Sequence, residues 1–419
     1  MVDSASDTSV SDELREDQRI WAQGDVECTP DLVIKGFRRL AEKCVRSGHP
    51  DRTTIEHTLS TRSVEEVVLL KETLLHQLQG YLLPALHGEI AILSNFLAKP
   101  HDLLKEPETK MKLVLKIQSH IERTLDKIKF SISFICPDTM SLRAPHRFDD
   151  QHLKRFKSYR LRSLRVKILR TKGYLYRLFV ASHILLANLK ASPDLIDPDH
   201  PGNWWKVEST LYAIDLTIEC ITGSELDVAQ LDWPSYVEDI DHVLHKVVTV
   251  INQCTHEVPR KMFVQEPVFH LAKLGIGLIK IARLFFKKLL IDRSLNARRI
   301  PLRLPLFTEM CSKQIESLAQ SLPLVAADIL QLENLFETVD VAHENPSGTD
   351  FIKVATSLKS RFQAPLVVLL LYLIPSISDT DGSSTQDYYK NWFVTWNTQF
   401  ILTTENFIGA AKSLDNNPP

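Results

Sequence analysis

Apolar residues recur every three to four positions along almost the whole chain, which is the spacing of one helix face. The chain holds only 13 Gly among 419 residues, and no segment alternates apolar and polar residues between hairpin turns. We therefore predict an all-α fold of long antiparallel helices in one or two helical bundles, with no regular repeat. The predicted helices cover about 31–46, 63–96, 109–134, 149–190, 203–222, 234–256, 262–292, 308–340, 349–374 and 385–413.

Local signals mark several helix ends. Ser63 is followed three residues later by Glu66, which predicts a capping box, and Pro84 is expected to kink the helix that follows. Clusters of Pro, Gly and Asp separate the helices, and the one near 195–203 predicts a boundary between two bundles. The predicted organisation is a disordered acidic tail over 1–30, an N-terminal helical bundle over 31–194, a C-terminal helical bundle over 203–413 and a tail over 414–419.

Composition indicates an intracellular protein. The six cysteines lie far apart without a CxxC pair, so a reducing cytoplasm or nucleus fits better than a disulfide framework. The Ser- and Asp-rich N-terminus lacks the basic and apolar regions of a secretory signal. The most apolar run, 364–377, contains two prolines and is short of the roughly 20 residues that span a bilayer, so we predict a buried core helix and no transmembrane segment.

Charged residues are distributed in alternating basic and acidic blocks, although the formal net charge is only −2. Residues 151–193 hold eleven Lys or Arg and no acid, whereas residues 194–259 hold thirteen Asp or Glu against two Lys. The next two blocks, 260–303 and 304–351, are basic and then acidic. We expect the first basic block and the acidic block after it to be neighbours that neutralise each other.

The cations of the first basic block are the candidate anion-binding residues. Lys157 and Arg160 fall on the apolar stripe of the helix and Lys167 lies at its edge, so these three need partners. We expect carboxylates of the acidic block, for instance Asp239 or Asp241, or side chains that extend to the surface, in preference to a bound anion. Acidic phospholipid or RNA would instead meet the outer cations Arg155, Arg162 and Arg165, together with Lys280 of helix 262–292.

Sequence motifs for catalysis or metal binding are weak. Asp239 and His242 share a helix face as acid and histidine ligands do in di-iron bundles, but the second such pair is missing. The chain has no GxSxG, HExxH or complete nucleotide-binding loop. We therefore predict no catalytic residues, no metal and no cofactor. The aromatic residues of helix 385–413 recur every three to four positions, which predicts a buried face: Tyr389, Trp392, Phe393, Trp396, Phe400 and Phe407.

Four stretches carry a resemblance to known sequences: QHLKRFKSYRL at 151–161, PLFTEM at 305–310, LKSRFQAPLVVLLLYLIP at 358–375 and YYKNWFVTWNTQF at 388–400. Together they resemble a family of fungal, chiefly basidiomycete, helical proteins without an assigned activity. The resemblance implies a helical fold and no particular function.

From these patterns we predict a non-enzymatic cytoplasmic scaffold or adaptor that binds a protein partner. The first alternative is binding of an acidic membrane surface or RNA through the basic helices. The second alternative is an enzyme or carrier with an unrecognised pocket. The sequence does not determine the oligomeric state.

Overall fold

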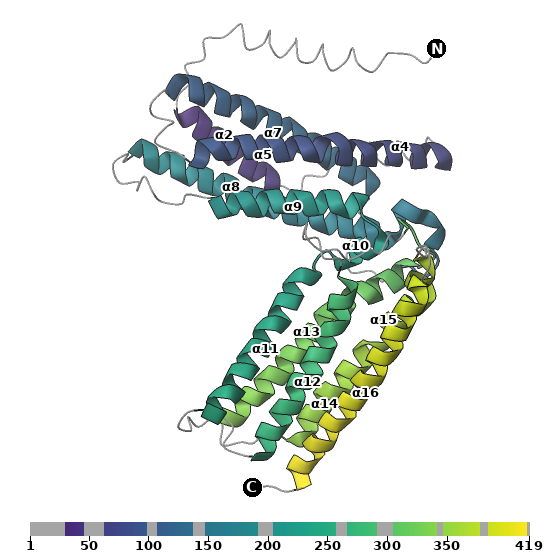
Figure 1. Ribbon diagram of the computed structural model, residues 1–419. Coiled ribbons are helices and arrows are strands. Elements are labelled where there is room, and N and C mark those ends of the chain that lie inside the picture. The colour runs from purple at the N-terminus through teal and green to yellow at the C-terminus, as the bar shows by residue number, and fades with distance from the viewer. Residues whose placement is uncertain are drawn as a thin grey trace. The chain divides into compact units, whose positions relative to one another are not determined.

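The computed structural model describes residues 30–45, 63–98, 107–136, 147–191, 204–256, 266–290, 305–341, 347–377 and 384–416. Within these ranges every regular element is a helix and no strand occurs, so the all-α prediction is confirmed (Figure 1). The predicted linker 195–203 and nearly all of the two predicted tails lie outside the described residues, although the last helix continues to Asn416.

The long helices lie close to the predicted stretches. They are α2 (Pro30–Val45), α4 (Val64–Gln77), α5 (Leu83–Ala98), α7 (Pro107–Ile135), α8 (Ser158–Ala191), α9 (Trp204–Thr222), α11 (Trp233–His256), α12 (Glu266–Leu289), α13 (Ser312–Val341), α14 (Gly348–Arg361) and α16 (Thr385–Asn416). Short elements lie between them: η1 (Leu78–Leu82), η2 (Gln151–Phe156), α10 (Glu225–Gln230), α15 (Gln363–Val368), η4 (Leu369–Leu373) and η5 (Ile374–Ser376).

The described residues belong to two compact units. Unit 1 comprises those of 1–67, 76–131 and 169–215, and unit 2 comprises those of 68–75, 132–168 and 216–419. The units are therefore not consecutive segments, because α4, α7, α8 and α9 each contribute residues to both. The boundary predicted from sequence lies instead within the linker 195–203.

Unit 2 is built on a closed ring of helices. α11 packs on α13, α13 on α14, α14 on α16, α16 on α12, and α12 again on α11. Figure 1 shows these helices running alongside one another in green and yellow. Aromatic side chains fill the space enclosed by these helices. The ring centroid of Phe285 lies 5.1 Å from that of Phe362 and 4.7 Å from that of Trp396, and Trp396 stacks on Phe400 at 4.9 Å.

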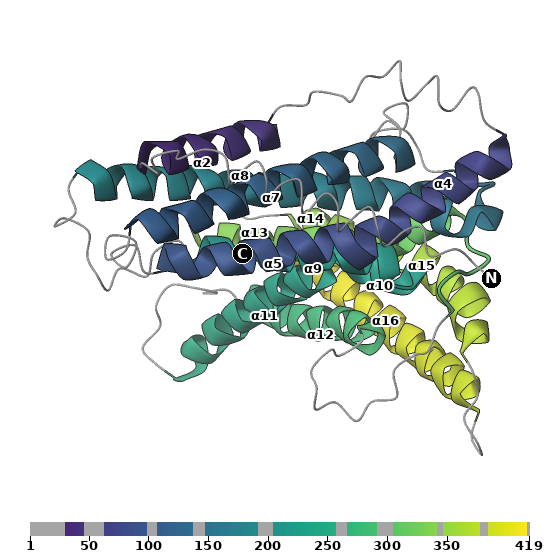
Figure 2. The ribbon, with the colours of Figure 1, turned by 90° about the horizontal axis from the view of Figure 1, so that it is seen from above.

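Unit 1 is a bundle in which α2, α5, α7 and α8 run roughly alongside one another (Figure 2). Phe37 of α2 and Phe179 of α8 are fully buried, and their ring centroids are 6.4 Å apart. Gln118 of α7 is buried too, and its Nε2 donates to the Val33 carbonyl of α2 at 3.0 Å. The apolar stripe of α7 from Met111 to Ile128 faces the core of this bundle.

Proline produces π turns at two places. Residues 64–98 form one helical run, and the π turn η1 ends two residues before Pro84, which has no N–H to continue the helical hydrogen bonds. The turn η4 precedes Pro375 in the same way. The capping box at the start of α4 is confirmed, with Glu66 N donating to Ser63 Oγ at 3.3 Å and Ser63 N to Glu66 Oε2 at 3.0 Å.

One short helix, α10, was not predicted, because the predicted helices 203–222 and 234–256 leave the segment GSELD at 223–227 between them. α10 begins there because Ser224 and Asp227 form a capping box, with Ser224 N donating to Asp227 Oδ2 at 2.8 Å. Six residues are too few to show a 3.6-residue period, so the cap was the available signal.

Candidate functional site

A buried ion pair lies in unit 2, where α8 begins. Lys157 Nζ is 2.5 Å from Glu225 Oε1 of α10, and neither side chain is exposed. The ammonium also donates to the Thr308 carbonyl at 2.7 Å. The backbone N–H and hydroxyl of Thr308 donate to Glu225 Oε2, the former at 3.0 Å. All these polar groups therefore satisfy one another without solvent.

Asp150 forms a second buried polar centre in unit 2. Its Oδ2 accepts from the Ser158 N–H of α8 at 2.8 Å and from the Ser312 hydroxyl at 2.6 Å, while Oδ1 accepts from the Ser312 N–H of α13 at 2.8 Å. Burial by itself raises the pKa of Asp150, but the hydrogen bonds from Ser312 and Ser158 outweigh it and leave the pKa below its ordinary value. One carboxylate thus caps the first turns of two helices.

Arg160 and Lys167 are also engaged within unit 2. Arg160 Nη2 donates to the carbonyls of Ile221 at 3.3 Å and Gly223 at 2.9 Å, and its guanidinium lies 5.5 Å from the Phe307 ring centroid. Lys167 Nζ lies 2.8 Å from Asp232 Oδ1. Burial lowers the pKa of Arg160, and nearby Glu225 opposes that shift.

The expectation that the basic block pairs with the acidic block is confirmed, but the expected partners were wrong. Glu225 and Asp232 take the place of Asp239 and Asp241. Asp241 of α11 binds Arg283 of α12, whose Nη2 donates to Asp241 Oδ2 at 2.7 Å. Helix periodicity identifies which face needs a partner, but it does not say which neighbouring helix supplies one.

The seven candidate anion-binding cations do not form one cluster on a single surface. Lys157, Arg160 and Lys167 are buried and bound to acceptors of the chain itself. Arg155, Arg162 and Arg165 are half-buried, and Lys280 is exposed on α12. Burial lowers the pKa of Arg162, and Glu316 opposes the shift. Binding of an anion by these residues stays a prediction.

Three cysteine thiols are buried and protonated at neutral pH. Burial raises the pKa of Cys44, Cys136 and Cys220 to about 12. The Cys136 thiol donates to the Leu161 carbonyl at 3.4 Å. Each of these thiols therefore acts as a small apolar group rather than as a nucleophile.

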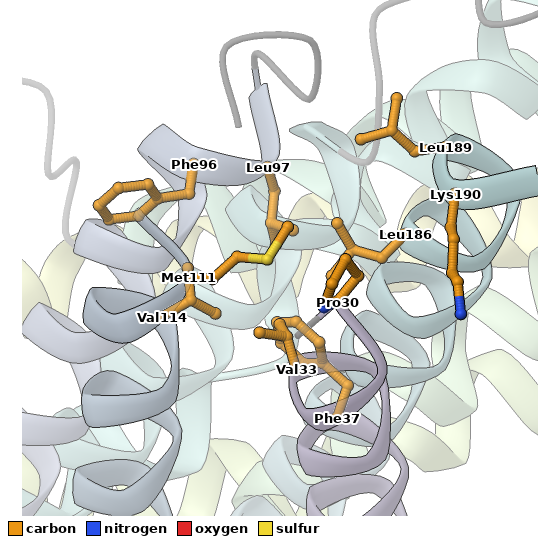
Figure 3. A pocket seen from close by; sticks show the side chains of 10 residues that line it. All are labelled: Pro30, Val33, Phe37, Phe96, Leu97, Met111, Val114, Leu186, Leu189 and Lys190. Carbon is orange, nitrogen blue, oxygen red and sulfur yellow. The ribbon is translucent and has the colours of Figure 1, made fainter. Parts of the chain in front are cut away.

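Unit 1 encloses a small apolar cavity between the ends of four helices (Figure 3). Its volume is about 40 Å³, which is room for about one water molecule. In Figure 3 the Lys190 ammonium points away from the apolar side chains, and it donates to Asp31 at 2.7 Å. The lining is Pro30, Val33, Phe37, Phe96, Leu97, Met111, Val114, Leu186, Leu189 and Lys190. Its size suits a packing gap rather than a ligand site.

A larger opening of about 510 Å³ lies on unit 1 between α2 and α8. Tyr176, Val180 and Ile184 form one wall, and Arg38 Nη2 lies 3.1 Å from His183 Nε2. Wall and rim thus combine apolar and polar groups, with no concentration of one charge.

Unit 2 carries an apolar groove of about 450 Å³ between the 359–370 segment and α16. Phe362, Phe393 and Phe400 form its buried floor. The groove residues are Lys359, Phe362, Gln363, Leu366, Val367, Leu370, Phe393, Val394, Asn397, Thr398, Phe400 and Ile401. Lys359 at the rim lies 2.6 Å from Glu405 Oε1. We refer to this set of residues as the apolar groove.

The prediction that the run 364–377 is a buried core helix holds for only one side of the run. Val367 is 54% exposed and Leu371 is 63% exposed, so one side of the run faces outward. Besides Pro365, the buried apolar residues of the run are Val368, Leu369, Leu373, Ile374 and Ile377.

The same region meets the length and composition criterion for a membrane helix. Residues Gly348–Ser376 form 29 consecutive helical or near-helical positions, with 39% of the most apolar window buried. Core helices of soluble proteins meet the same criterion, so the absence of a transmembrane segment stays a prediction.

The aromatic face of α16 is confirmed for four residues and differs for two. Phe393, Trp396, Phe400 and Phe407 are buried. Tyr389 and Trp392 are only half-buried, because they turn toward Lys288 near the end of α12. A buried stripe and a ring that covers a cation have the same spacing, so the sequence pattern did not separate them.

Comparison with known proteins identifies two adjoining family matches. Residues 71–222 match the family described as Domain of unknown function (DUF8723), and residues 224–409 match Domain of unknown function (DUF8721). No curated protein and no solved structure matches the chain. The resemblance to proteins without an assigned function is thereby confirmed, while the fungal origin stays a prediction. The chain is therefore similar, over residues 71–222 and 224–409, to two families whose function is not known.

Proposed function

We propose that this protein is a non-enzymatic intracellular adaptor that binds an amphipathic helix of a protein partner in the apolar groove of unit 2. The observation that carries the proposal is the exposure of apolar side chains from two neighbouring helical segments over a floor of buried phenylalanines. Val367 is 54% exposed and Val394 is 59% exposed. Contiguous apolar surface that a monomer leaves uncovered is typical of an interaction site.

The dimensions of the groove suit a helix. Val394, Asn397 and Ile401 line it at i, i+3 and i+7 along α16. Seven residues of an α-helix span about 10 Å, which is two turns. A partner helix with apolar residues at the same spacing could seat two turns in the groove.

The rim supports a partner with polar flanks rather than one that is apolar all round. Gln363, Asn397 and Thr398 lie at the groove, and Lys359 is held by Glu405 at its edge. An apolar centre with a polar rim is the usual composition of a non-obligate protein interface. A lipid surface would offer no hydrogen-bonding groups of fixed position to this rim.

Binding of an acidic membrane surface or RNA remains the alternative, and the contacts of the basic block weaken it. Lys157 and Lys167 pair with Glu225 and Asp232, so their charges are already neutralised. Contacts to phosphate groups release counterions, so such binding falls steeply as salt rises. A protein interface with an apolar centre tolerates salt much better.

The test compares wild-type protein with Val394→Glu in pull-downs from native extract at low and moderate salt. Val394 is exposed, so the substitution should leave the fold intact while it places a charge in the groove. We expect a defined protein to be retained by wild type at both salt concentrations and reduced at least about tenfold by V394E. Leu113→Glu on α7, at another exposed apolar residue, is the matched control and should bind as wild type does.

Direct crosslinking identifies the contact. A photoreactive residue at position 394 should crosslink to the same protein that the pull-down retains, and one at position 113 should not. Equal crosslinking at both positions, or retention by V394E at the wild-type level, would rule out the groove. Binding only to acidic vesicles or RNA, lost between low and moderate salt, would favour the alternative.

A further inference from the structure

Three aromatic rings surround the ammonium of Lys288 in unit 2. Lys288 Nζ lies 4.5 Å from the ring centroid of Tyr388, 5.1 Å from that of Tyr389 and 5.3 Å from that of Trp392. It also donates to the Tyr388 hydroxyl at 2.8 Å. Within the described part of the chain no carboxylate pairs with Lys288, whereas its neighbour Lys287 lies 3.6 Å from Asp241. The contacts of Lys288 are thus with aromatic residues.

The arrangement follows from the packing of α12 along α16. Positions 388, 389 and 392 lie in the first two turns of α16 and project toward the end of α12, where Lys288 lies. Trp392 packs edge-on against Phe393 at 4.9 Å, and Phe393 is buried in the core. Trp392 is therefore in contact with the core through Phe393, and Tyr388 and Tyr389 pack on each other at 5.3 Å between ring centroids.

Several aromatic faces turned toward one point make a site for a cation, because each ring is negative on its face. A primary ammonium is compact and strongly hydrated, so it loses much hydration when rings surround it. A trimethylammonium group is less hydrated and contacts the rings through its methyl groups. Cages of this kind are the usual means by which proteins recognise quaternary ammonium groups.

We propose that Tyr388, Tyr389 and Trp392 form a binding cage for alkylated ammonium groups, and that Lys288 occupies it as a tethered internal ligand. The exposed Tyr388, at 56%, forms the side open to an incoming ligand. Lys288 competes with the ligand for the cage. The apparent affinity is therefore the affinity for the empty cage multiplied by the fraction of molecules in which the cage is empty. This site is distinct from the apolar groove and does not depend on the proposed function.

The experiment uses the full chain as wild type, Lys288→Ala and Lys288→Gln, titrated with tetramethylammonium. Binding is followed by the indole N–H resonances of labelled tryptophan, with the Trp392 signal assigned from W392F. We expect both Lys288 variants to shift the Trp392 signal at millimolar ligand, with affinity roughly tenfold or more above wild type. Lys280→Ala removes another lysine, an exposed one, from the same helix and should behave as wild type.

A second substitution separates the cage from unspecific effects. Trp392→Ala, added to Lys288→Ala, should remove the binding as measured by calorimetry. Unchanged affinity in that double variant would overturn the proposal. So would the absence of any Trp392 response in wild type, K288A and K288Q together.

Two further probes distinguish the source of the alkylated ammonium. Nε-trimethyllysine amide stands for a modified protein side chain, and phosphocholine stands for a lipid headgroup. If one of these probes binds more tightly than tetramethylammonium, and Trp392→Ala removes that binding, the result supports the cage and identifies the kind of molecule that carries the alkylated ammonium. A response to tetramethylammonium alone supports the cage for small alkylammonium ions.

Discussion

Lys157 and Glu225 carry opposite charges inside unit 2, and neither side chain reaches solvent. Such a pair adds little net stability over apolar residues of similar volume, but removal of one partner leaves a buried charge unpaired. The pair therefore favours this arrangement of α8, α10 and the segment that contains Thr308, because an arrangement without the contact would leave a buried charge unpaired.

The first prediction concerns this pair. Lys157→Met should lower the free energy of unfolding by about 3–5 kcal/mol, because Glu225 is then buried without its cation. Glu225→Gln should also be destabilising, because Lys157 is then buried without a carboxylate. The double variant should recover much of the loss, and chemical denaturation of all four proteins measures the coupling. Additive losses would mean that the two charges do not depend on each other.

Glu89 of unit 1 provides a pH-dependent contribution to stability. Burial raises the pKa of Glu89 to about 7, although the Thr124 hydroxyl donates to its Oε1 at 3.2 Å and opposes the shift. The folded state therefore holds a proton that the unfolded state releases above its ordinary pKa near 4.5. Stability from this group is present below about pH 4.5 and is lost as the pH rises through about 7.

The second prediction follows from that sign. Glu89→Gln should unfold like wild type at pH 4 and should be more stable than wild type at pH 8, by about 1–2 kcal/mol after solvent screening. Melting curves measured from pH 4 to 8 check this. A difference between the two proteins that does not vary with pH would contradict the assignment to Glu89.

Helices α8 and α13 start at the same carboxylate, so their first turns are linked at the scale of elements. Asp150 accepts from the Ser158 and Ser312 N–H groups, which have no partner within their own helices. Asp150 directly precedes η2, and within η2 the chain departs from helical geometry at Lys154, whose φ is 49°. The first turns of α8 and α13 are therefore expected to form and to be lost together.

The third prediction tests this shared cap. Asp150→Asn should destabilise the protein by about 2–4 kcal/mol, because a neutral amide cannot accept the charge-assisted hydrogen bonds of both helices. Asp149→Asn is the matched control, since Asp149 is exposed and pairs with Arg147 at the surface, and it should change stability little. Hydrogen exchange should show the loss of protection in the first turns of both α8 and α13. Loss confined to one helix would contradict the shared cap.

The pKa of Asp150 adds a pH signature to the same test. Because its pKa is lowered in the folded state, its contribution is present above the ordinary value of 3.8 and is lost as the pH falls through the folded value. Wild type and D150N should therefore converge in stability at strongly acidic pH.

At the scale of the whole molecule, the family matches and the compact units divide the chain differently. The matches meet near residue 223, whereas unit 2 includes residues 132–168 together with 216–419. Asp150, Lys157 and Arg160 thus belong to the sequence of the first match and to the structure of unit 2. The two matched segments depend on each other for their buried polar groups.

The fourth prediction is about fragments. A fragment of residues 204–416, close to the C-terminal bundle expected from sequence, lacks Lys157, the cation that pairs with Glu225, and Asp150, the acceptor for Ser312. We expect it to melt without a cooperative transition or well below the full chain, as seen by circular dichroism and calorimetry. A peptide of residues 147–168 added in trans should restore part of the transition. Cooperative melting of the bare fragment at the temperature of the full chain would show that it folds independently.

The sequence by itself determined the helical class and the approximate helix limits, because apolar periodicity and caps are local properties that each segment carries alone. It also determined that Lys157, Arg160 and Lys167 needed partners, since three cations on or beside an apolar stripe cannot all stay unpaired. The tertiary structure decided which groups those partners are, because Glu225 and Thr308 approach Lys157 from positions 68 and 151 residues away. It also decided which apolar side chains remain outside, at Val367 and Val394, and which rings surround Lys288. Composition does not distinguish a buried face from a face that no other helix covers, and that distinction depends on how the helices pack.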